Sequence, residues 1–169
     1  MSWIWLDNKK YSSKQTTKGT SFNETPVNYC VASFRKEFQF DKEIESIELK
    51  FACDTSGYLL LDNKVVFIDN AKTNGDFWMK TGIIKEAYYL KDIIRFNKGT
   101  SSFTLKSFVQ LGVTRLYDFS SGHGGLFVEG EITFADKTKA KIETDTTWDA
   151  KLENSYPNPS EFNNLIKEE

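Results

Sequence analysis

Apolar and polar side chains alternate one by one along several short segments of this chain, and this period of two constrains its fold more than any other feature. In residues 29–40 one phase holds Cys30, Ala32, Phe34, Phe38 and Phe40, while the other holds Ser33, Arg35, Glu37 and Gln39. A strand with one buried face and one solvated face has this pattern. The same alternation returns in residues 47–53, 103–111 and 126–134. We therefore expect antiparallel sheets that turn one face toward a core.

Three clusters of turn-forming residues predict hairpins: Asp41-Lys42-Glu43, Asp62-Asn63-Lys64 and Ala135-Asp136-Lys137. The first would pair residues 29–40 with residues 47–53. Aromatic residues, which fit a pleated and half-buried surface, make up 15% of the chain. Seven or more short strands with such turns predict an all-β fold, a two-layer antiparallel sandwich. Its expected core comprises Phe34, Phe38, Leu49, Phe51, Leu105, Leu126, Val128 and Ile132.

The length of 169 residues suits one domain. We predict that residues 1–150 form the sandwich and that residues 151–169 form a C-terminal linker or tail. Tyr156-Pro157-Asn158-Pro159 cannot extend a strand ladder, since proline lacks the N–H donor that pairing needs.

Charge and composition exclude several function classes. The net charge of −2 offers no basic field for a phosphate backbone, so we expect no nucleic-acid partner. No stretch approaches the roughly 20 apolar residues that a spanning helix needs, so we expect no membrane partner. One histidine and two cysteines are too few for the usual zinc sites. The N-terminus lacks the pattern of a secretory signal, which favours a cytoplasmic protein with reduced, buried Cys30 and Cys53.

Catalytic motifs are missing from the sequence. There is no Gly-x-Ser-x-Gly nucleophile elbow and no phosphate-cradling glycine loop, so we assign no catalytic residue. A paired-carboxylate hydrolase stays open, because sequence alone cannot pair the 24 acids. We expect no cofactor and no metal site. Calcium is possible through the turn carboxylates Asp54, Asp62, Asp69 and Asp76, although no EF-hand spacing is present.

Two polar loops contain the candidate ligand-binding residues. Trp78 lies with Asp76 in a loop over residues 69–82, where an aromatic side chain is less expected to be core. Tyr117 and His123 belong to a second loop, residues 112–125. The four tryptophans could offer flat faces to sugar rings, but aromatic residues more often supply core area. His123 could bond a ligand, although a lone loop histidine is usually just solvated.

Three sets of short motifs follow one another along the chain. They are Phe34-Arg35-Lys36-Glu37-Phe38; Ala52-Cys53-Asp54 with Tyr58-Leu59-Leu60-Leu61-Asp62-Asn63-Lys64; and Gly124-Gly125-Leu126 with Asp136-Lys137-Thr138 and Thr144-Asp145-Thr146-Thr147-Trp148. With the opening Trp3-Ile4-Trp5, their order and spacing resemble the N-terminal β-sandwich domain of bacterial α-L-rhamnosidases. Lys64 and Lys137 depart from this pattern, since the family usually has glycine there. We interpret the matched Tyr58 and residues 145–148 as core, turn and strand-closing residues.

The resemblance implies a jelly-roll, galactose-binding-like sandwich that precedes a helical catalytic barrel in the parent enzyme. That barrel is absent from this chain, so no catalytic residue carries over. The leading hypothesis is a non-catalytic accessory domain of an α-L-rhamnosidase-like glycoside hydrolase. An independent lectin-like carbohydrate-binding module and a purely structural docking domain are the alternatives. The expected partner is accordingly a rhamnose-containing glycan or the catalytic domain of a parent hydrolase.

Overall fold

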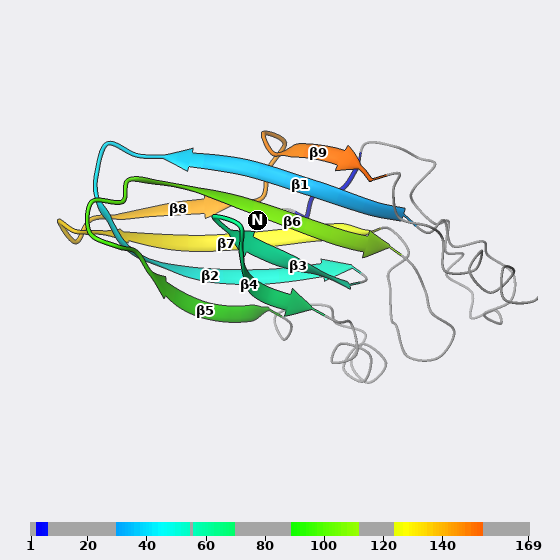
Figure 1. Ribbon diagram of the computed structural model, residues 1–169, viewed down its shortest axis with the longest axis horizontal. Helices are drawn as coiled ribbons and strands as arrows, with labels where there is room; N and C mark the ends of the chain where they lie inside the picture. The colour runs from blue at the N-terminus through cyan, green and yellow to red at the C-terminus, as the bar shows by residue number, and fades with distance from the viewer. Residues whose placement is uncertain (1–2, 7–29, 55, 70–88, 112–123, 154–169) are drawn as a thin grey trace, which may run out of the picture.

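The structure of the protein is a computed structural model that describes residues 3–6, 30–54, 56–69, 89–111 and 124–153 (Figure 1). These residues form strands and turns. The strands are β1 (Cys30–Gln39), β2 (Ile44–Asp54), β3 (Ser56–Leu61), β4 (Lys64–Asp69), β5 (Leu90–Arg95), β6 (Ser102–Leu111), β7 (Gly125–Phe134), β8 (Lys139–Glu143) and β9 (Asp149–Leu152). The described part of the chain includes no helix with the length and hydropathy needed to cross a membrane.

Two antiparallel sheets pack face to face. Sheet A has the strand order β5-β2-β7-β8, and sheet B has the order β4-β3-β6-β1-β9. Every strand pairing in both sheets is antiparallel. The predicted all-β, two-layer antiparallel sandwich is therefore confirmed.

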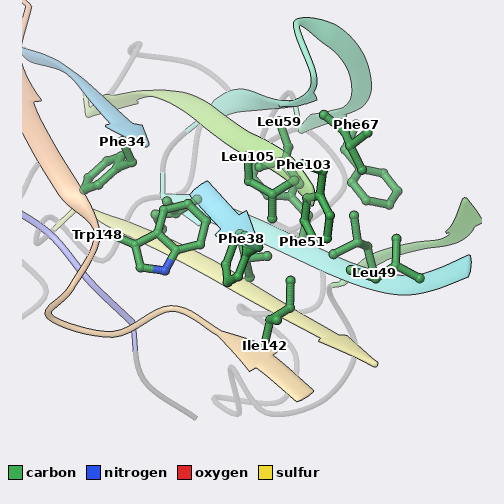
Figure 2. Packing of buried hydrophobic residues seen from close by; sticks show 14 of the residues in the cluster. Phe34, Phe38, Leu49, Phe51, Leu59, Phe67, Phe103, Leu105, Ile142 and Trp148 are labelled. Carbon is green, nitrogen blue, oxygen red and sulfur yellow. The ribbon is translucent and has the colours of Figure 1, made fainter. Parts of the chain in front are cut away.

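The core lies between the two sheets and consists of the inward phases of their strands (Figure 2). All eight residues predicted for the core are buried. Rings from different strands meet there: Phe51 of β2 stacks on Phe67 of β4, with centroids 5.9 Å apart. Trp148, just before β9, meets Phe38 edge-on at 6.1 Å and donates its indole N–H to the Glu143 carbonyl at 3.1 Å. The core thus closes with its polar indole group satisfied.

The predicted hairpin between residues 29–40 and 47–53 is wrong. The link over residues 40–43 crosses from sheet B to sheet A, so β1 and β2 belong to different sheets. β1 pairs instead with β6, far along the chain, and with β9. Alternation shows which face of a strand is buried, but it does not show which strand is its neighbour. Two amphipathic strands can bury their apolar faces side by side in one sheet or face to face in two packed sheets.

The other two predicted hairpins are confirmed as β3–β4 and β7–β8. Asp62 and Asn63 both have positive φ, at 47° and 67°, as a two-residue type I′ turn requires. In the β7–β8 turn, Lys137 has a φ of 67°. This is one of the positions where the resemblance called for glycine, which takes such a backbone angle at no steric cost.

Cys30 and Cys53 are buried free thiols, as predicted, with one in each sheet. Burial raises the pKa of Cys30 to about 11 and that of Cys53 well above its ordinary value. β9 ends at Leu152, and Glu153 still donates its backbone N–H to the Val31 carbonyl. The division of the chain into a domain and a tail at residue 150 stays a prediction.

Candidate functional site

The four ligand-binding residues predicted from sequence, Asp76, Trp78, Tyr117 and His123, lie outside the described residues. Their assignment therefore stays a prediction. The described residues that flank them are informative nonetheless. β4 and β6 finish, and β5 and β7 begin, at the same end of the sandwich (Figure 1). Residues 70–88, which include Asp76 and Trp78, and residues 112–123, which include Tyr117 and His123, therefore connect to the described strands at the same end of the sandwich. We call this end the loop end.

Calcium ligands do not gather in the described part of the chain. There, no group of three or more His, Cys, Asp or Glu side chains is arranged to hold a metal ion. Asp62 accepts a hydrogen bond from the Thr104 backbone N–H at 2.8 Å, and Asp69 accepts one from Cys53 N–H at 3.4 Å. Asp76 lies outside the described residues, so the calcium hypothesis remains a prediction.

A row of aromatic side chains crosses the outer face of sheet A at its loop end. Its centre is Phe127 of β7, which is 1% exposed although it lies outside the core cluster. Phe127 is buried because two rings flank it: the Trp3 centroid is 5.7 Å away and the Tyr89 centroid 4.8 Å away. Ala52 of β2 pairs with Phe127 in register and leaves room for these rings. Trp3 remains 47% exposed, so the row ends in an accessible indole face.

Glycines fix Trp3 and Trp5 against β7. The Ile4 N–H donates to the Leu126 carbonyl at 3.0 Å and the Leu126 N–H donates back at 2.9 Å, which holds the N-terminal segment beside β7. A Cβ atom on Gly125 would lie 2.6 Å from the Trp3 ring. A Cβ on Gly124, which has a φ of 71°, would lie 2.3 Å from the Trp5 ring. Both glycines thus supply the space that the indoles occupy.

Two rows of side chains, all charged except Ile93, follow the aromatic row along sheet A. In register across β5, β2, β7 and β8, the nearer row is Lys91, Lys50, Glu129 and Glu143, and the farther row is Ile93, Glu48, Glu131 and Lys141. Several direct cross-strand neighbours therefore carry like charges, which by itself destabilises a sheet. Ion pairs compensate: Lys50–Glu129 at 2.8 Å, Lys91–Glu48 at 2.7 Å and Lys139–Glu131 at 2.5 Å.

The charged rows enclose a shallow hollow of about 220 Å³ on the outer face of sheet A. Its lining combines three carboxylates and two amines over the backbone of a glycine, namely Glu48, Glu129, Glu131, Lys50, Lys141 and Gly130. Gly130 has no side chain, and a Cβ there would point inward to within 3.0 Å of Ile47 and Leu49. Among the described residues, Lys141 has no ion-pair partner.

The ion pairs keep these groups charged. The hydrogen bond to Glu129 raises the pKa of Lys50, and the charges of Glu129 and Glu48 add to this. The hydrogen bond from Lys91 lowers the pKa of Glu48, and that to Glu131 raises the pKa of Lys139. The hollow therefore presents carboxylate acceptors and ammonium donors side by side at neutral pH.

The outer face of sheet B has a different character. Tyr58 of β3 stacks on Phe108 of β6, with centroids 5.3 Å apart, and is half-buried there rather than part of the core as interpreted from sequence. Beside it on β4 lie Val65, 52% exposed, and Ile68, 68% exposed. The other matched residues do form a turn, because Asp145 accepts from the Thr147 N–H at 2.8 Å.

Sequence reasoning missed the sheet A site almost entirely. The alternation showed that Glu48 and Lys50 face outward, but it could not show that β2, β7 and β8 are neighbours. The sequence marked Trp3 as one of four tryptophans and as part of the opening Trp3-Ile4-Trp5, but not as a binding residue. Two sequence features could have indicated the site: the pair Gly124-Gly125 and the motif Trp3-Ile4-Trp5. Glycines leave space beside a strand that large side chains such as indoles can fill.

Comparisons with known proteins found likeness in structure only. No protein-family model matches the chain, and no curated protein matches its sequence. The Pleurotus ostreatus lectin, solved in complex with GalNAc, matches 88% of this chain at 12% identity with a TM-score of 0.59. The Streptomyces avermitilis α-L-rhamnosidase, complexed with L-rhamnose, matches 94% at 15% identity with a TM-score of 0.54. The Aspergillus terreus α-L-rhamnosidase matches 83% at 17% identity with a TM-score of 0.56.

These matches concern the sandwich fold. The chain spans 35% of the lectin chain and 12% and 16% of the two rhamnosidase chains. In each case the shared sandwich is thus a minor part of a longer protein.

Proposed function

We propose that this protein is a carbohydrate-binding sandwich domain and that the outer face of sheet A is its binding surface. One observation carries the proposal: the exposed indole of Trp3, which flanks Phe127, lies on the same face of sheet A as a hollow lined by carboxylates and ammonium groups, and this hollow begins at Glu129, the next outward residue of β7. The fold likeness to a lectin and to parts of two glycoside hydrolases supports the same class of ligand.

The chemistry of the surface suits hydroxyl-rich ligands. A pyranose ring has an apolar face of C–H groups that can stack on an indole, as apolar bodies do on aromatic faces. Its hydroxyls both donate and accept, so one hydroxyl can bond a glutamate and a lysine together. Within the lining, Lys50 and Glu129 already sit 2.8 Å apart, which is the arrangement that such bridging needs.

Charged ligands suit the part of the hollow around Lys50 and Glu48 less well. An anion there would compete with Glu129 for Lys50, and a cation would compete with Lys91 for Glu48. Either competition breaks an existing ion pair and leaves its other member unpaired, which costs free energy. A neutral ligand rich in hydroxyls can join the network without breaking it.

The finer proposal is that the domain accompanies the catalytic part of an α-L-rhamnosidase-like glycoside hydrolase. The motif order from Trp3 to Trp148 and the fold of two rhamnosidases support it. In this role the chain binds sugar and leaves hydrolysis to another domain. Purified protein should release no p-nitrophenol from p-nitrophenyl α-L-rhamnoside. Turnover that a single carboxylate substitution abolishes would contradict this role.

A glycan array tests the binding function, with L-rhamnose and rhamnose-containing oligosaccharides among the spotted glycans. We expect the wild-type protein to bind, and Trp3→Ala to lose at least tenfold in affinity in a follow-up titration. Tyr58→Ala, an aromatic truncation on sheet B, is the matched control and should bind like the wild type.

The array also separates this function from the docking role. If the protein binds no glycan on the array and none in a titration with millimolar glycan, the carbohydrate proposal fails. The result would then favour a docking domain that uses the apolar face of sheet B. If Tyr58→Ala loses binding while Trp3→Ala keeps it, the binding site lies on sheet B and the proposed site on sheet A is wrong.

A further inference from the structure

The relative positions of the aromatic row and the hollow suggest the size of the ligand. Phe127, Glu129 and Glu131 are successive outward residues of β7, and a strand rises about 3.4 Å per residue. The aromatic row and the farther charged row are therefore about 14 Å apart along β7, four residues of rise. A single pyranose ring is about as wide as one indole ring. A monosaccharide on Trp3 thus cannot reach the farther row.

Trp3 and Lys141 lie on the same edge of β7. The N-terminal segment pairs with Leu126 on the edge of β7 that faces away from β2, and β8 pairs with Glu129 to Thr133 on that edge. Lys141 is the register partner of Glu131. A path along this edge runs from the indole, past Glu129, to Lys141, and the hollow borders it from Glu129 onward.

A path across the strands is the alternative. It would lead from Trp3 over Phe127 to Tyr89. Phe127 is only 1% exposed, so the centre of this path offers little surface, and the path bypasses the hollow. The accessible polar groups lie along β7.

We infer that the site binds an extended oligosaccharide of at least two linked rings, which runs along β7 from Trp3 toward Lys141. This rests on the proposed carbohydrate-binding function and adds the size and direction of the ligand. One terminal ring stacks on Trp3. The next ring lies over the Lys50–Glu129 pair, and further rings reach Glu131 and Lys141.

An array that presents each sugar as one, two and three linked rings tests the size directly. For the sugar that binds, the affinity should rise at least tenfold from one ring to three, because rings beyond the first contact the hollow. Equal affinity for one and three rings would overturn the inference and leave the proposed function standing. The absence of binding at every length would instead overturn both.

Substitution at the far end tests the direction. Lys141 is exposed and has no ion-pair partner among the described residues, so Lys141→Ala should leave the fold intact. We expect it to weaken binding of the three-ring ligand severalfold and to leave one-ring binding unchanged, whereas Trp3→Ala weakens both. Lys98→Ala, at an exposed lysine in a turn outside the site, is the matched control. Unchanged three-ring binding by Lys141→Ala, or an equal loss for both lengths, would contradict the direction.

Discussion

The outer faces of the two sheets differ although their inner faces are alike. Inward, both sheets present large aliphatic and aromatic side chains to one core. Outward, sheet A has an aromatic row beside paired charges and a hollow, whereas sheet B has the stacked pair Tyr58–Phe108 beside the exposed Val65 and Ile68. The core requires only apolar side chains of suitable volume. The chemical differences that can support a function therefore lie in the outward phases.

The two outer faces also differ in how their aromatic residues are covered. On sheet A, Trp3 and Tyr89 come from outside the long strands and bury Phe127. On sheet B, Tyr58 and Phe108 belong to neighbouring strands, cover each other, and stay half-buried. On sheet A, residues from outside the long strands thus bury an outward side chain, and one of them, Trp3, also belongs to the proposed site.

Phe127→Ala should have the largest effect. We expect it to lower the free energy of unfolding by about 3–5 kcal/mol, the usual loss when a buried phenylalanine is truncated. The matched truncation on sheet B, Phe108→Ala, should cost less than half as much, because its ring is already partly in water. Urea unfolding followed by circular dichroism measures both. Equal losses would mean that the aromatic row does not bury Phe127 as described.

A pair of glycines in β7 sharpens the comparison of inner and outer faces. Gly130→Ala directs a methyl group into the core, within 2.9–3.0 Å of Ile142, Ile47 and Leu49, and should destabilise by about 1–3 kcal/mol through overpacking. Gly125→Ala directs it outward against the Trp3 ring, which can move because it is half in water. We expect little loss of stability but weaker glycan binding. The reverse order of stability losses in urea unfolding would show that β7 faces the other way.

The sequence predicted the inner face better than the outer one. All eight residues that the period-two alternation predicted for the core are buried, because the side of a strand on which a residue lies depends only on its position within that strand. The pairing of β1 with β6 was missed, since it depends on residues about seventy positions apart. The sheet A site was missed for the same reason: Lys50 and Glu129 meet only through the register of β2 with β7.

Each sheet contains one buried thiol, and the reactivity of the two thiols should change with pH. Burial raises the pKa of Cys30 in sheet B to about 11, and desolvation with the nearby Asp69 charge raises that of Cys53 in sheet A well above its ordinary value. Only the thiolate reacts with alkylating reagents. At pH 8 neither thiol should react with iodoacetamide in the folded protein, and both should react in urea. As the pH rises toward 11, Cys30 should begin to react in the folded protein. Peptide mass spectrometry would locate the label, and modification of either thiol in the folded protein at pH 8 would contradict the assignment.

The smallest expected effect is the pH dependence of the ion pairs on sheet A. The hydrogen bond from Lys91 holds the pKa of Glu48 below its ordinary value of 4.5, so this pair stabilises the fold above pH 4.5 and the contribution disappears as the pH falls through the lowered pKa. Exposed pairs contribute little and are screened by salt. Glu48→Gln should therefore melt slightly lower than the wild type at pH 7, and the difference should vanish near pH 2. High salt should reduce this melting difference at pH 7.

Glu37→Gln, on the outer face of sheet B, is the matched control, because the Glu37–Arg35 ion pair is longer, at 3.4 Å. If its melting difference at pH 7 is as large as that of Glu48→Gln, the charged rows of sheet A have no special electrostatic role, and the hollow offers a ligand only its shape and its hydrogen-bonding groups.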